Sequence, residues 1–462
     1  MINGIGLKVY IAGVCGISMS AIAKVLKEEG HIVCGSDEKT EGQIIDDLNL
    51  HGIQTFSNLC TDGIVKVNPE TFIYSVAIKE ENPEFIYSKC NNIQVMSRGE
   101  ALGLISQSFQ KTVAISGSHG KTTTTALLSH IFLNSKRDIS CHIGGIVKNI
   151  NSNYHLGQKR EIFVTEACEY HDSFLNLNPD VAVVLNIGDD HLDYFKSKEN
   201  IKSSFLKFIN KVKIGGVVVL NIDDEYLLSI SENIRKKYRV ITYSKFNNNA
   251  DVYIVNNRKL AGGRIVFDCS YFGAVIDNVH LSMVGEHNLY NAMVSLIVSK
   301  EFGVNDSQIV ESIASFAGVK RRYEYITKLN GAEVIHDYAH HPDEIDAVVG
   351  ETLSITEGNL YVVFEPHTYT RTKRLWDDFI RVLRKPYRVI LLPIYPAREN
   401  PIQDVSSENL CYHINKNGGA SYFVPNYDVL YCILHRLVKD NDKVLILGAG
   451  DIVNFTEYLL TR

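Results

Sequence analysis

The segment Ser116-Gly-Ser-His-Gly-Lys-Thr-Thr123 combines residue types that can hold a phosphate group. It follows an apolar run over residues 112–115 and precedes a stretch with helical periodicity over 124–132. Glycines let the backbone fold around phosphate oxygens, and the N-terminus of a following helix points N–H groups at them. Lys121 can reach the β- and γ-phosphates, and Thr122 can ligate Mg²⁺. The predicted ATP contacts here are Gly117, Ser118, His119, Gly120, Lys121, Thr122 and Thr123.

The spacing of this loop is unusual. It reads GxxGKT, two residues shorter than the common GxxxxGK[ST], so the strand–loop–helix context gives it most of its weight. A glycine turn with a chance Lys-Thr is the structural alternative. A GTPase would need a base-reading NKxD segment downstream, but the nearest match, 210–213, reads Asn-Lys-Val-Lys. The pattern therefore favours an ATP-using protein over a GTP switch.

Polar side chains also follow two other apolar runs. Glu166 follows residues 162–165, and Asn186-Ile-Gly-Asp-Asp-His191 follows residues 181–185. Parallel strands present their carboxyl ends to ligands at one edge of the sheet, and a carboxylate there suits Mg²⁺. His191 could be a ligand or an ordinary polar loop residue. Asn288 and Asn291 lie three apart on one face of a predicted helix over 288–302, and helix capping explains the first but not both.

Short apolar runs alternate with helical periodicity along the chain, as in βαβ units. We predict an α/β protein of three domains: an N-terminal Rossmann-like domain over 1–107, a central P-loop ATPase domain over 108–318 and a C-terminal Rossmann-like domain over 319–462. The expected strands are 8–12, 31–34, 71–74, 112–115, 162–165, 181–185, 333–335, 360–364, 388–392 and 443–447, and the first helix covers 18–29.

Composition excludes several classes of protein. The 462 residues suit about three domains, and 47 basic against 53 acidic residues leave a net charge of −6, which disfavours nucleic acid as a partner. Apolar runs are far shorter than the roughly 20 residues of a membrane span, and the N-terminus lacks a signal-peptide pattern. We expect a cytoplasmic protein without membrane insertion. Nine cysteines without a CxxC pair predict buried, reduced thiols.

Together these segments resemble the Mur ligases, ATP-dependent amide-forming enzymes of peptidoglycan synthesis, over essentially the whole chain. Several spaced motifs in the same order are far more specific than any one of them. The landmarks are Gly13-Val-Cys-Gly-Ile-Ser-Met19, Gly35-Ser-Asp37, Tyr74-Ser-Val-Ala-Ile78, Asn82-Pro-Glu84, Arg98-Gly-Glu100, the loop over 117–123, Glu166, His191, His287-Asn288, Asn291, Gly318-Val-Lys-Arg-Arg322, Asp337-Tyr-Ala-His-His-Pro342, Pro366-His-Thr-Tyr-Thr-Arg371 and Gly448-Ala-Gly-Asp451.

The resemblance also bears on the N-terminal glycines. Gly13-x-x-Gly16 after a strand, with Asp37 about 20 residues on, could indicate a dinucleotide site, but GxGxxG would need glycine at Cys15 and Ser18. NAD is therefore a weak prediction. In the Mur ligases the same Rossmann-like shape holds the UDP moiety of a sugar nucleotide. The contacts this implies are Gly13, Gly16, Ser18, Met19, Ser36, Asp37, Ser75 and Arg98.

The resemblance further implies a reaction. ATP phosphorylates the lactyl carboxylate of UDP-N-acetylmuramate, and the amine of L-alanine attacks the acyl phosphate, which then releases phosphate. Lys121 and Mg²⁺ neutralise charge, with Thr122 and Glu166 on one metal ion and His191 helping to hold a second. Further ATP contacts implied are Asn288, Asn291, Arg322 and Asp337. The alanine contacts implied are Tyr338, His340 and Arg371, whose guanidinium suits a carboxylate.

Some positions depart from the family pattern. Ser118 replaces threonine in the loop, Thr368 replaces an arginine, and Cys168 and Tyr170 replace polar residues after Glu166. Lys207 stands near the position of a carbamylated lysine of some relatives, but we interpret it as a surface residue. The alternatives are a murein tripeptide ligase acting on the same sugar nucleotide and a non-catalytic nucleotide-gated binding protein. We expect a monomer or homodimer.

Overall fold

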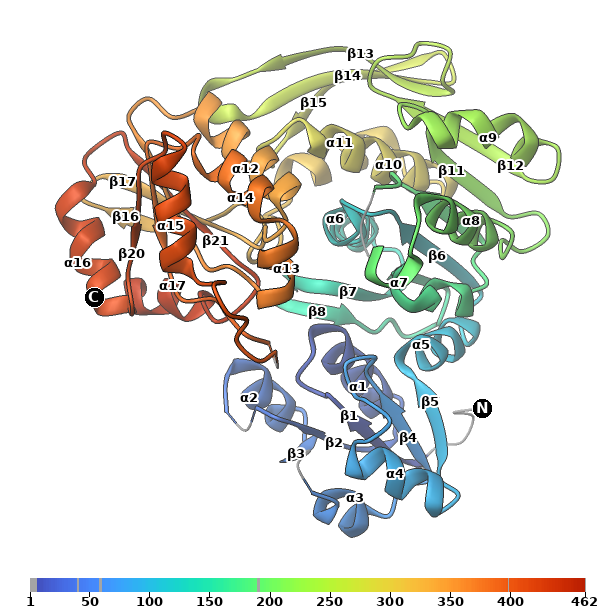
Figure 1. Cartoon of the computed structure of the whole chain (residues 1–462). Helices are drawn as coiled ribbons and strands as arrows, with labels where there is room; N and C mark the ends of the chain where they lie inside the picture. The colour runs from blue at the N-terminus through green and yellow to red at the C-terminus, as the bar shows by residue number, and fades with distance from the viewer. Residues whose placement is uncertain (1–5, 40, 58–59, 189–191, 398, 462) are drawn as a thin grey trace. The chain divides into compact units, whose positions relative to one another are not determined.

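The computed structural model describes residues 6–39, 41–57, 60–188, 192–397 and 399–461 (Figure 1). Three α/β domains are present, each built on one sheet. The chain divides into two compact units: the first comprises Met1–Arg258, Val266–Ser282 and Glu286–Gly318, and the second comprises Lys259–Ile265, Met283–Gly285 and Val319–Arg462. Because this division joins the first two sheets in one unit, the three residue ranges given above for the domains remain predictions.

The first sheet is parallel, with the strand order β3-β2-β1-β4-β5. Its central strand is buried from Val9 to Ala12, which is why this strand reads as a continuous apolar run. The strands are β1 (Lys8–Ala12), β2 (Ile32–Asp37), β3 (Gln54–Ser57), β4 (Thr71–Tyr74) and β5 (Gln94–Ser97). The helices are α1 (Ile17–Glu28), α2 (Gln43–Leu50), α3 (Asp62–Val67), α4 (Pro83–Cys90) and α5 (Arg98–Gln107).

The second sheet has ten strands in the order β15-β14-β13-β12-β11-β10-β6-β9-β7-β8. Parallel pairing runs from β13 to β7, and β8 adds an antiparallel edge. The strands are β6 (Lys111–Ser116), β7 (Ile139–Val147), β8 (Ser152–His155), β9 (Ile162–Glu166), β10 (Val181–Val184), β11 (Val217–Asn221), β12 (Arg239–Ser244), β13 (Val252–Lys259), β14 (Ile265–Tyr271) and β15 (Ala274–Leu281). The helices are α6 (Lys121–Asn134), η1 (Tyr170–Asn176), α7 (Leu192–Phe195), α8 (Lys198–Ile209), α9 (Glu225–Arg235), η2 (Ala261–Gly263), α10 (His287–Glu301) and α11 (Asp306–Ser315).

The third sheet has the order β16-β17-β21-β18-β19-β20, with β16 antiparallel to β17 and the other pairs parallel. Apolar clusters cover both of its faces. The strands are β16 (Glu324–Leu329), β17 (Ala332–Asp337), β18 (Leu360–Phe364), β19 (Arg388–Leu391), β20 (Ser421–Phe423) and β21 (Lys443–Leu447). The helices are α12 (Pro342–Ser354), α13 (Tyr369–Arg374), α14 (Trp376–Leu383), α15 (Ser407–Lys416), α16 (Tyr427–Leu437) and α17 (Val453–Leu460).

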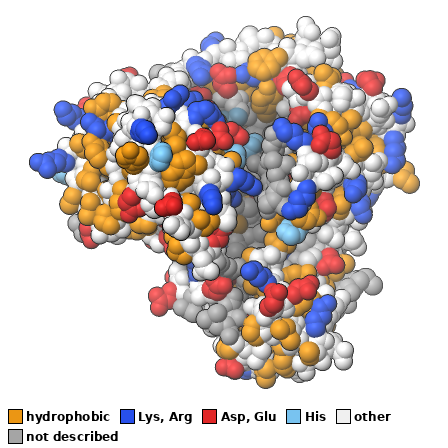
Figure 2. All heavy atoms as spheres, in the orientation of Figure 1, with side chains coloured by type: hydrophobic (Ala, Val, Ile, Leu, Met, Phe, Trp, Pro, Cys, Tyr) orange, Lys and Arg blue, Asp and Glu red, His pale blue; other side chains and the backbone are white. Residues whose placement is uncertain are grey.

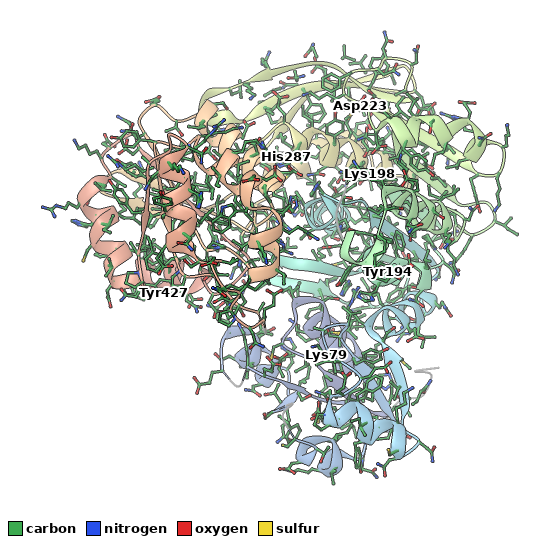
Figure 3. The ribbon with its side chains drawn as sticks, viewed as in Figure 1. Lys79, Tyr194, Lys198, Asp223, His287 and Tyr427 are labelled. Atoms are coloured by element: carbon green, nitrogen blue, oxygen red, sulfur yellow. The ribbon has the colours of Figure 1, made fainter. Side chains whose placement is uncertain are left out.

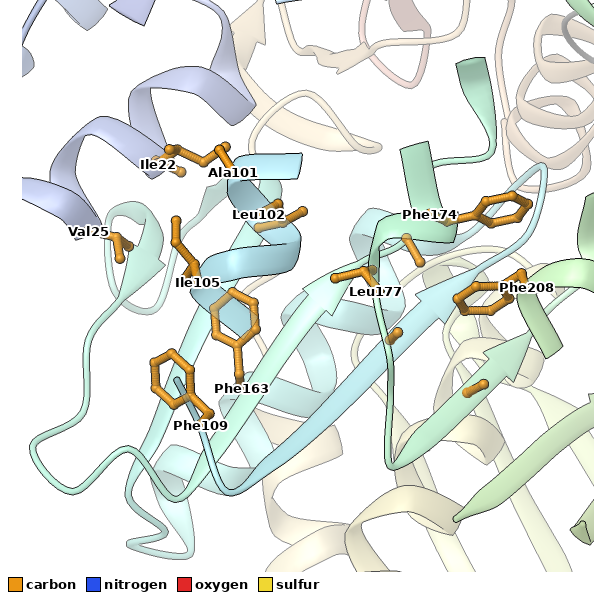
Figure 4. Packing of buried hydrophobic residues seen from close by; sticks show 14 of the residues in the cluster. Ile22, Val25, Ala101, Leu102, Ile105, Phe109, Phe163, Phe174, Leu177 and Phe208 are labelled. Atoms are coloured by element: carbon orange, nitrogen blue, oxygen red, sulfur yellow. The ribbon is translucent and has the colours of Figure 1, made fainter. Parts of the chain in front are cut away.

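One apolar core joins the first two sheets. Side chains of α1 and α5 pack into the same cluster as those of β9, η1 and α8 (Figure 4). Phe109 and Phe163 stack with their ring centroids 4.9 Å apart. A Cβ on Gly103 would lie 2.5 Å from the Asn176 carbonyl oxygen, so only glycine lets α5 approach η1 this closely. This shared core explains why the two domains form one unit.

Phe174 is the central ring of this core. It is 1% exposed, and its ring lies 4.8 Å from that of Phe208 and 5.4 Å from that of Phe205. Phe174→Ala is expected to lower the free energy of unfolding by about 3–5 kcal/mol, because it leaves a cavity between the two remaining rings. Urea denaturation measures the loss. Phe246→Ala is the control, since Phe246 is 77% exposed; equal losses in the two variants would contradict the prediction.

The cysteines differ from expectation. The structure records all nine as free, but Cys60, Cys90 and Cys432 are exposed, so the prediction that the cysteines are buried is wrong for these three. Apolar neighbours in the sequence do not reveal which face of an element a side chain occupies.

Basic and acidic side chains are interspersed over the face drawn in Figure 2. In the described parts of the chain, every helix is too short or too polar to cross a membrane.

Candidate active site

The predicted phosphate loop connects β6 to α6 and depends on two glycines. Gly117 has φ +142°, and a Cβ there would lie 2.9 Å from the Cβ of Leu185. Gly120 has φ +89°, and a Cβ there would lie 2.7 Å from Oδ1 of Asn291. Side chains at these positions would be strained and would fill the space around the loop. The first N–H groups of α6 lack partners within the helix, as anion-binding helix ends do.

Asn186, just beyond β10, clamps the tip of this loop. Its Oδ1 accepts from the His119 N–H at 2.9 Å, its carbonyl accepts from the Ser118 N–H at 3.1 Å, and its Nδ2 donates to the His119 carbonyl at 3.1 Å. Ser118 Oγ accepts in turn from the Gly188 N–H at 2.8 Å. Two of the amides expected to face phosphate are therefore engaged by Asn186. The N–H groups that can still donate to a phosphate are those in the first turn of α6.

Lys121 forms a buried ion pair with Glu169, a residue to which the sequence analysis assigned no role. Its Nζ lies 3.0 Å from Glu169 Oε2, donates to the Ser118 carbonyl at 3.0 Å and also contacts the Gly117 carbonyl. The Glu169 side chain is 2% exposed. Burial acts to lower the pKa of Lys121, but Glu169 and its neighbours outweigh this effect and raise it. Lys121 is thus a cation held at the loop by a buried carboxylate.

Glu166 leaves the sheet beside the loop. Ile115 of β6 pairs in register with Glu166 of β9, one residue before the loop begins at Ser116. The Gly144 N–H of β7 donates to the Glu166 carboxylate, and a Cβ on Gly144 would lie 2.8 Å from both carboxylate oxygens. The glycine therefore makes room for this side chain.

The donor set is compatible with Mg²⁺. Glu166 offers a carboxylate at a strand end, and Thr122 offers a hydroxyl in the first turn of α6; both are the oxygen ligands that Mg²⁺ prefers. His191, the third predicted ligand, lies outside the described residues. Within residues 6–188 and the later described segments, no three His, Cys, Asp or Glu side chains converge on a metal position.

Asn288 and Asn291 lie behind the loop in α10. Both are buried, Asn291 Nδ2 donates to Asn288 Oδ1 at 2.8 Å, and Thr124 Oγ1 of α6 donates to Asn291 Oδ1 at 2.9 Å. His287 opens this helix, and Asp223 follows β11 (Figure 3). The two asparagines thus support the loop from α10, and their interpretation as adenine contacts stays a prediction.

The N-terminal glycine loop is braced by Ser36 and Asp37 at the end of β2. The Ser36 carbonyl accepts from the Gly13 N–H at 2.8 Å, and Asp37 Oδ2 accepts from the Cys15 N–H at 2.9 Å. The Ser36 side chain is fully buried and donates to Glu84 at 2.5 Å. Of the predicted sugar-nucleotide contacts, Ser36 and Asp37 therefore support the loop by accepting hydrogen bonds from its backbone N–H groups.

The remaining predicted contacts in this region also lie around the loop. Gly16 donates its N–H to the Gly13 carbonyl at 3.1 Å, and Ser75 lies beside Gly13, 3.1 Å from where a Cβ would stand. Met19 is 2% exposed and belongs to the shared core. Arg98, at the start of α5, donates to Ser18 Oγ at 3.2 Å. The structure thus brings α1, β4 and α5 together at one loop.

In the second unit, Asp337 organises the chain after β17. Its carboxylate accepts from the Tyr323 N–H at 2.7 Å and the Ala339 N–H at 2.8 Å. Burial raises the pKa of Asp337, against the effect of Arg322. The Arg322 guanidinium lies 5.3 Å from the centroid of the Tyr338 ring. Arg322, Asp337 and Tyr338 therefore form one cluster.

Arg321 was not singled out from the sequence, yet it is tied more closely to the C-terminal glycine turn. Its guanidinium donates to the Gly448 carbonyl at 3.0 Å and lies 4.7 Å from the Tyr338 ring centroid. The Gly448-Ala-Gly-Asp451 motif, which neighbours Arg321 in space but not in sequence, was the signal that could have indicated a partner for it.

His340 and Arg371 meet at His367. The His340 and His367 ring centroids are 5.8 Å apart, and Arg371 donates to His367 Nδ1 at 3.3 Å. Burial, followed by the charge of Arg371, lowers the pKa of His367 to about 4. Thr368 caps α13 by accepting from the Arg371 N–H at 3.4 Å. The predicted alanine contacts Tyr338, His340 and Arg371 thus lie in one connected cluster of the second unit.

Glu365, which directly follows β18, is a buried carboxylate whose effect on stability should depend on pH. It is 6% exposed, and burial raises its pKa to about 7. The folded chain then binds a proton that the unfolded chain releases, so stability falls as pH rises from about 4.5 to 7. Glu365→Gln is expected to be more stable than the parent at pH 8, by up to about 3 kcal/mol, and similar at pH 4.5.

Urea denaturation at both pH values measures the difference, with exposed Glu357→Gln as the matched control. A constant gap between Glu365→Gln and the parent across this range would contradict the assignment.

The chain matches three family descriptions: the Mur ligase family catalytic domain over residues 8–110, the Mur ligase middle domain over 115–299 and the Mur ligase glutamate ligase domain over 321–450. It is 36% identical over 460 residues to a UDP-N-acetylmuramate–L-alanine ligase of Clostridium acetobutylicum, covering 100% of this chain and 99% of that protein. A protein of the same name from Clostridium tetani is 38% identical over 445 residues, covering 96% of each.

Solved structures share the fold. A UDP-N-acetylmuramate–alanine ligase of Thermotoga maritima superposes with a TM-score of 0.83 at 23% identity, covering 99% of both chains. A murein peptide ligase of Psychrobacter arcticus gives 0.73 at 22% identity, covering 99% of this chain and 98% of that one.

Fold and loop together define the class of protein: three α/β domains, with a phosphate-type loop between a strand and a helix in the middle one. The three matched segments and the identity to relatives over the full length show which family of this class the chain belongs to. The chain belongs to the Mur ligase family.

Proposed function

We propose that this protein is an ATP-dependent ligase that joins L-alanine to the lactyl carboxylate of UDP-N-acetylmuramate in peptidoglycan precursor synthesis. The observation that carries the proposal is the full-length identity of 36% to a ligase of that name, together with the buried Lys121–Glu169 pair at the loop. A phosphoryl-transfer site needs a fixed cation at the phosphates, and this pair supports the proposal because it fixes the Lys121 ammonium beside the loop proposed to bind them.

The residues of this chain have separable tasks in that reaction. The start of α6 and Lys121 bind the ATP phosphates, while Gly117 and Gly120 leave room for them. Thr122 and Glu166 would hold a Mg²⁺ ion, which would supply positive charge beside the phosphates, and His191 would help to hold a second ion. Asn288, Asn291, Arg322 and Asp337 complete the nucleotide contacts of the proposal.

The acceptor half of the reaction uses other residues. The loop from Gly13 to Met19, with Ser75 and Arg98, holds the sugar nucleotide, and Ser36 and Asp37 brace that loop. Arg371 presents its guanidinium to the carboxylate of L-alanine, beside Tyr338 and His340. The amine then attacks an acyl phosphate formed on the lactyl group, and phosphate departs.

Phosphate release from Mg-ATP tests this proposal. The full chain is given UDP-N-acetylmuramate with L-alanine, another amino acid or a murein tripeptide in turn. Release that requires L-alanine supports the proposal. Release that follows the tripeptide instead would identify the sister enzyme, and no release with any acceptor would support a nucleotide-gated binding protein. Light scattering would show whether the protein is a monomer or a homodimer.

We also propose a cytoplasmic location. Lys207 is exposed on α8, so we propose no metal role for it.

A further inference from the structure

A buried histidine stands between the first two domains and contacts the proposed sugar-nucleotide loop at Ser18. His142 of β7 is 2% exposed. Its Nε2 lies 2.8 Å from Ser18 Oγ of α1, and its Nδ1 lies 3.2 Å from Thr165 Oγ1 of β9. The register of the sheet sets the second contact, because His142 pairs directly with Thr165. The ring therefore bridges two elements that are distant in sequence.

The hydrogen bonds at this ring form a continuous chain. Arg98 donates to Ser18 Oγ at 3.2 Å, and Thr165 Oγ1 donates to the Glu166 carbonyl at 3.1 Å. With the proton on Nδ1, Ser18 donates to His142 and His142 donates to Thr165, so every hydroxyl both accepts and donates. The alternative tautomer leaves Thr165 donating to the ring and breaks its bond to Glu166. The Ser18 carbonyl oxygen lies 3.3 Å from the same Nε2 and can accept from it when Nε2 carries the proton, so either tautomer joins the ring to α1.

The two ends of this chain are residues with proposed roles. Ser18 and Arg98 belong to the sugar-nucleotide site, and Glu166 belongs to the magnesium site. Burial, then the charge of Arg98, lowers the pKa of His142 to about 4, so the ring is neutral at pH 7 and acts as a hydrogen-bond bridge. Acyl-phosphate formation requires the carboxylate and the metal to be in register, and a displacement of about 1 Å can cost about 100-fold in rate.

We propose that His142 is a positioning residue that holds Ser18 and Arg98 of the sugar-nucleotide site in register with the strand end that carries Glu166. This inference rests on the proposed function for the roles of its two ends. His142 is not itself among the proposed substrate contacts, and the inference is that it affects how the two sites work together.

The first test is His142→Phe in the full chain. We expect KM for UDP-N-acetylmuramate to rise about tenfold and kcat to fall about tenfold, because Ser18 and Thr165 lose their shared partner. KM for ATP should stay within about threefold, since the phosphate loop makes none of these contacts. His142→Gln, which can still reach Ser18, should recover part of the KM effect.

Thr165→Val tests the other end of the chain without altering the ring. It should raise KM for UDP-N-acetylmuramate although Thr165 lies outside that site. The double variant with His142→Phe should be no worse than His142→Phe alone, because both changes break one chain. If His142→Phe does not fold, the KM shift in Thr165→Val decides the question.

Asn153→Ala is the matched control. Asn153 joins the same two domains, donating to the Ile17 carbonyl at 2.6 Å and accepting from Lys24 at 2.9 Å, but it makes no contact in the His142 chain. Thermal unfolding should show that it loosens the protein at least as much, while KM for the sugar nucleotide stays within about twofold. Equal KM shifts in the two variants, or an unchanged KM in a folded His142→Phe, would overturn the inference.

Failure of the proposed function has a different signature. In that case the parent chain itself releases no phosphate with L-alanine. Calorimetric titration of UDP-N-acetylmuramate then replaces KM as the readout. A larger dissociation constant in both His142→Phe and Thr165→Val, with the constant of Asn153→Ala unchanged, would still support the positioning role. Unchanged dissociation constants in all three variants would refute it.

Discussion

Lys121→Ala is expected to lower kcat for L-alanine-dependent phosphate release by about a thousandfold, because it removes the cation held at the phosphate loop. It also removes the Lys121 ammonium from its buried ion pair with Glu169, whose side chain is 2% exposed. Breaking a buried pair costs about 3–5 kcal/mol, so the variant is also expected to be less stable. Initial rates and urea denaturation, measured on the same preparation, give the two effects separately.

A second substitution separates catalysis from folding. Lys121→Ala combined with Glu169→Gln removes the buried charge as well as the lysine, so stability should recover while turnover does not. Lys111→Ala is the surface control: its side chain is 58% exposed and pairs with Asp180, which Lys213 also contacts. Recovery of turnover in the double variant would show that Lys121 serves only to neutralise Glu169.

Gly144→Ala is expected to act on the metal site from a neighbouring strand. The added methyl group would lie 2.8 Å from both oxygens of Glu166, so the carboxylate must move. We expect kcat to fall about 100-fold, the cost of misplacing a reacting geometry by about 1 Å, and the Mg²⁺ concentration for half-maximal rate to rise. Magnesium titrations of the rate, at saturating substrates, measure both quantities.

The controls for this variant isolate the clash. Gly350→Ala adds the same methyl group where a Cβ would meet nothing within 4 Å, and should leave the magnesium curve unchanged. Glu166→Gln should reproduce the higher magnesium requirement without the steric change. A magnesium curve for Gly144→Ala that superposes on that of the parent would show that Glu166 does not bind the metal ion.

Much of the fold was predictable from local pattern. The strands over 8–12, 71–74, 360–364 and 443–447 were predicted with the bounds that the structure has, because each is a continuous apolar run or has one after a single polar residue. The helix predicted over 124–132 is longer, Lys121–Asn134, because its start is set by the backbone of Gly120 and its first turn is polar. The antiparallel strands β8 and β16 had no comparable signal, since both are short or half-exposed.

The candidate site was likewise predictable only in part. The loop, Glu166 and the Mur ligase motifs were found from residue types and spacing. The partner of Lys121 was not, because Glu169 stands 48 residues away and only the parallel pairing of β6 with β9 brings the two segments together. Asn186 was expected at the crevice, but its capture of the loop amides depends on β10 lying beside β6.

The sequence by itself determined the family, the order of the elements and the phosphate loop, because each depends on residues that are neighbours along the chain. Tertiary structure alone decided which side chains meet: Lys121 with Glu169, Gly144 with Glu166, and His142 with Ser18, which is 124 residues away. Such contacts depend on strand register and on packing between domains, and a shift of one residue turns each strand side chain to the opposite face.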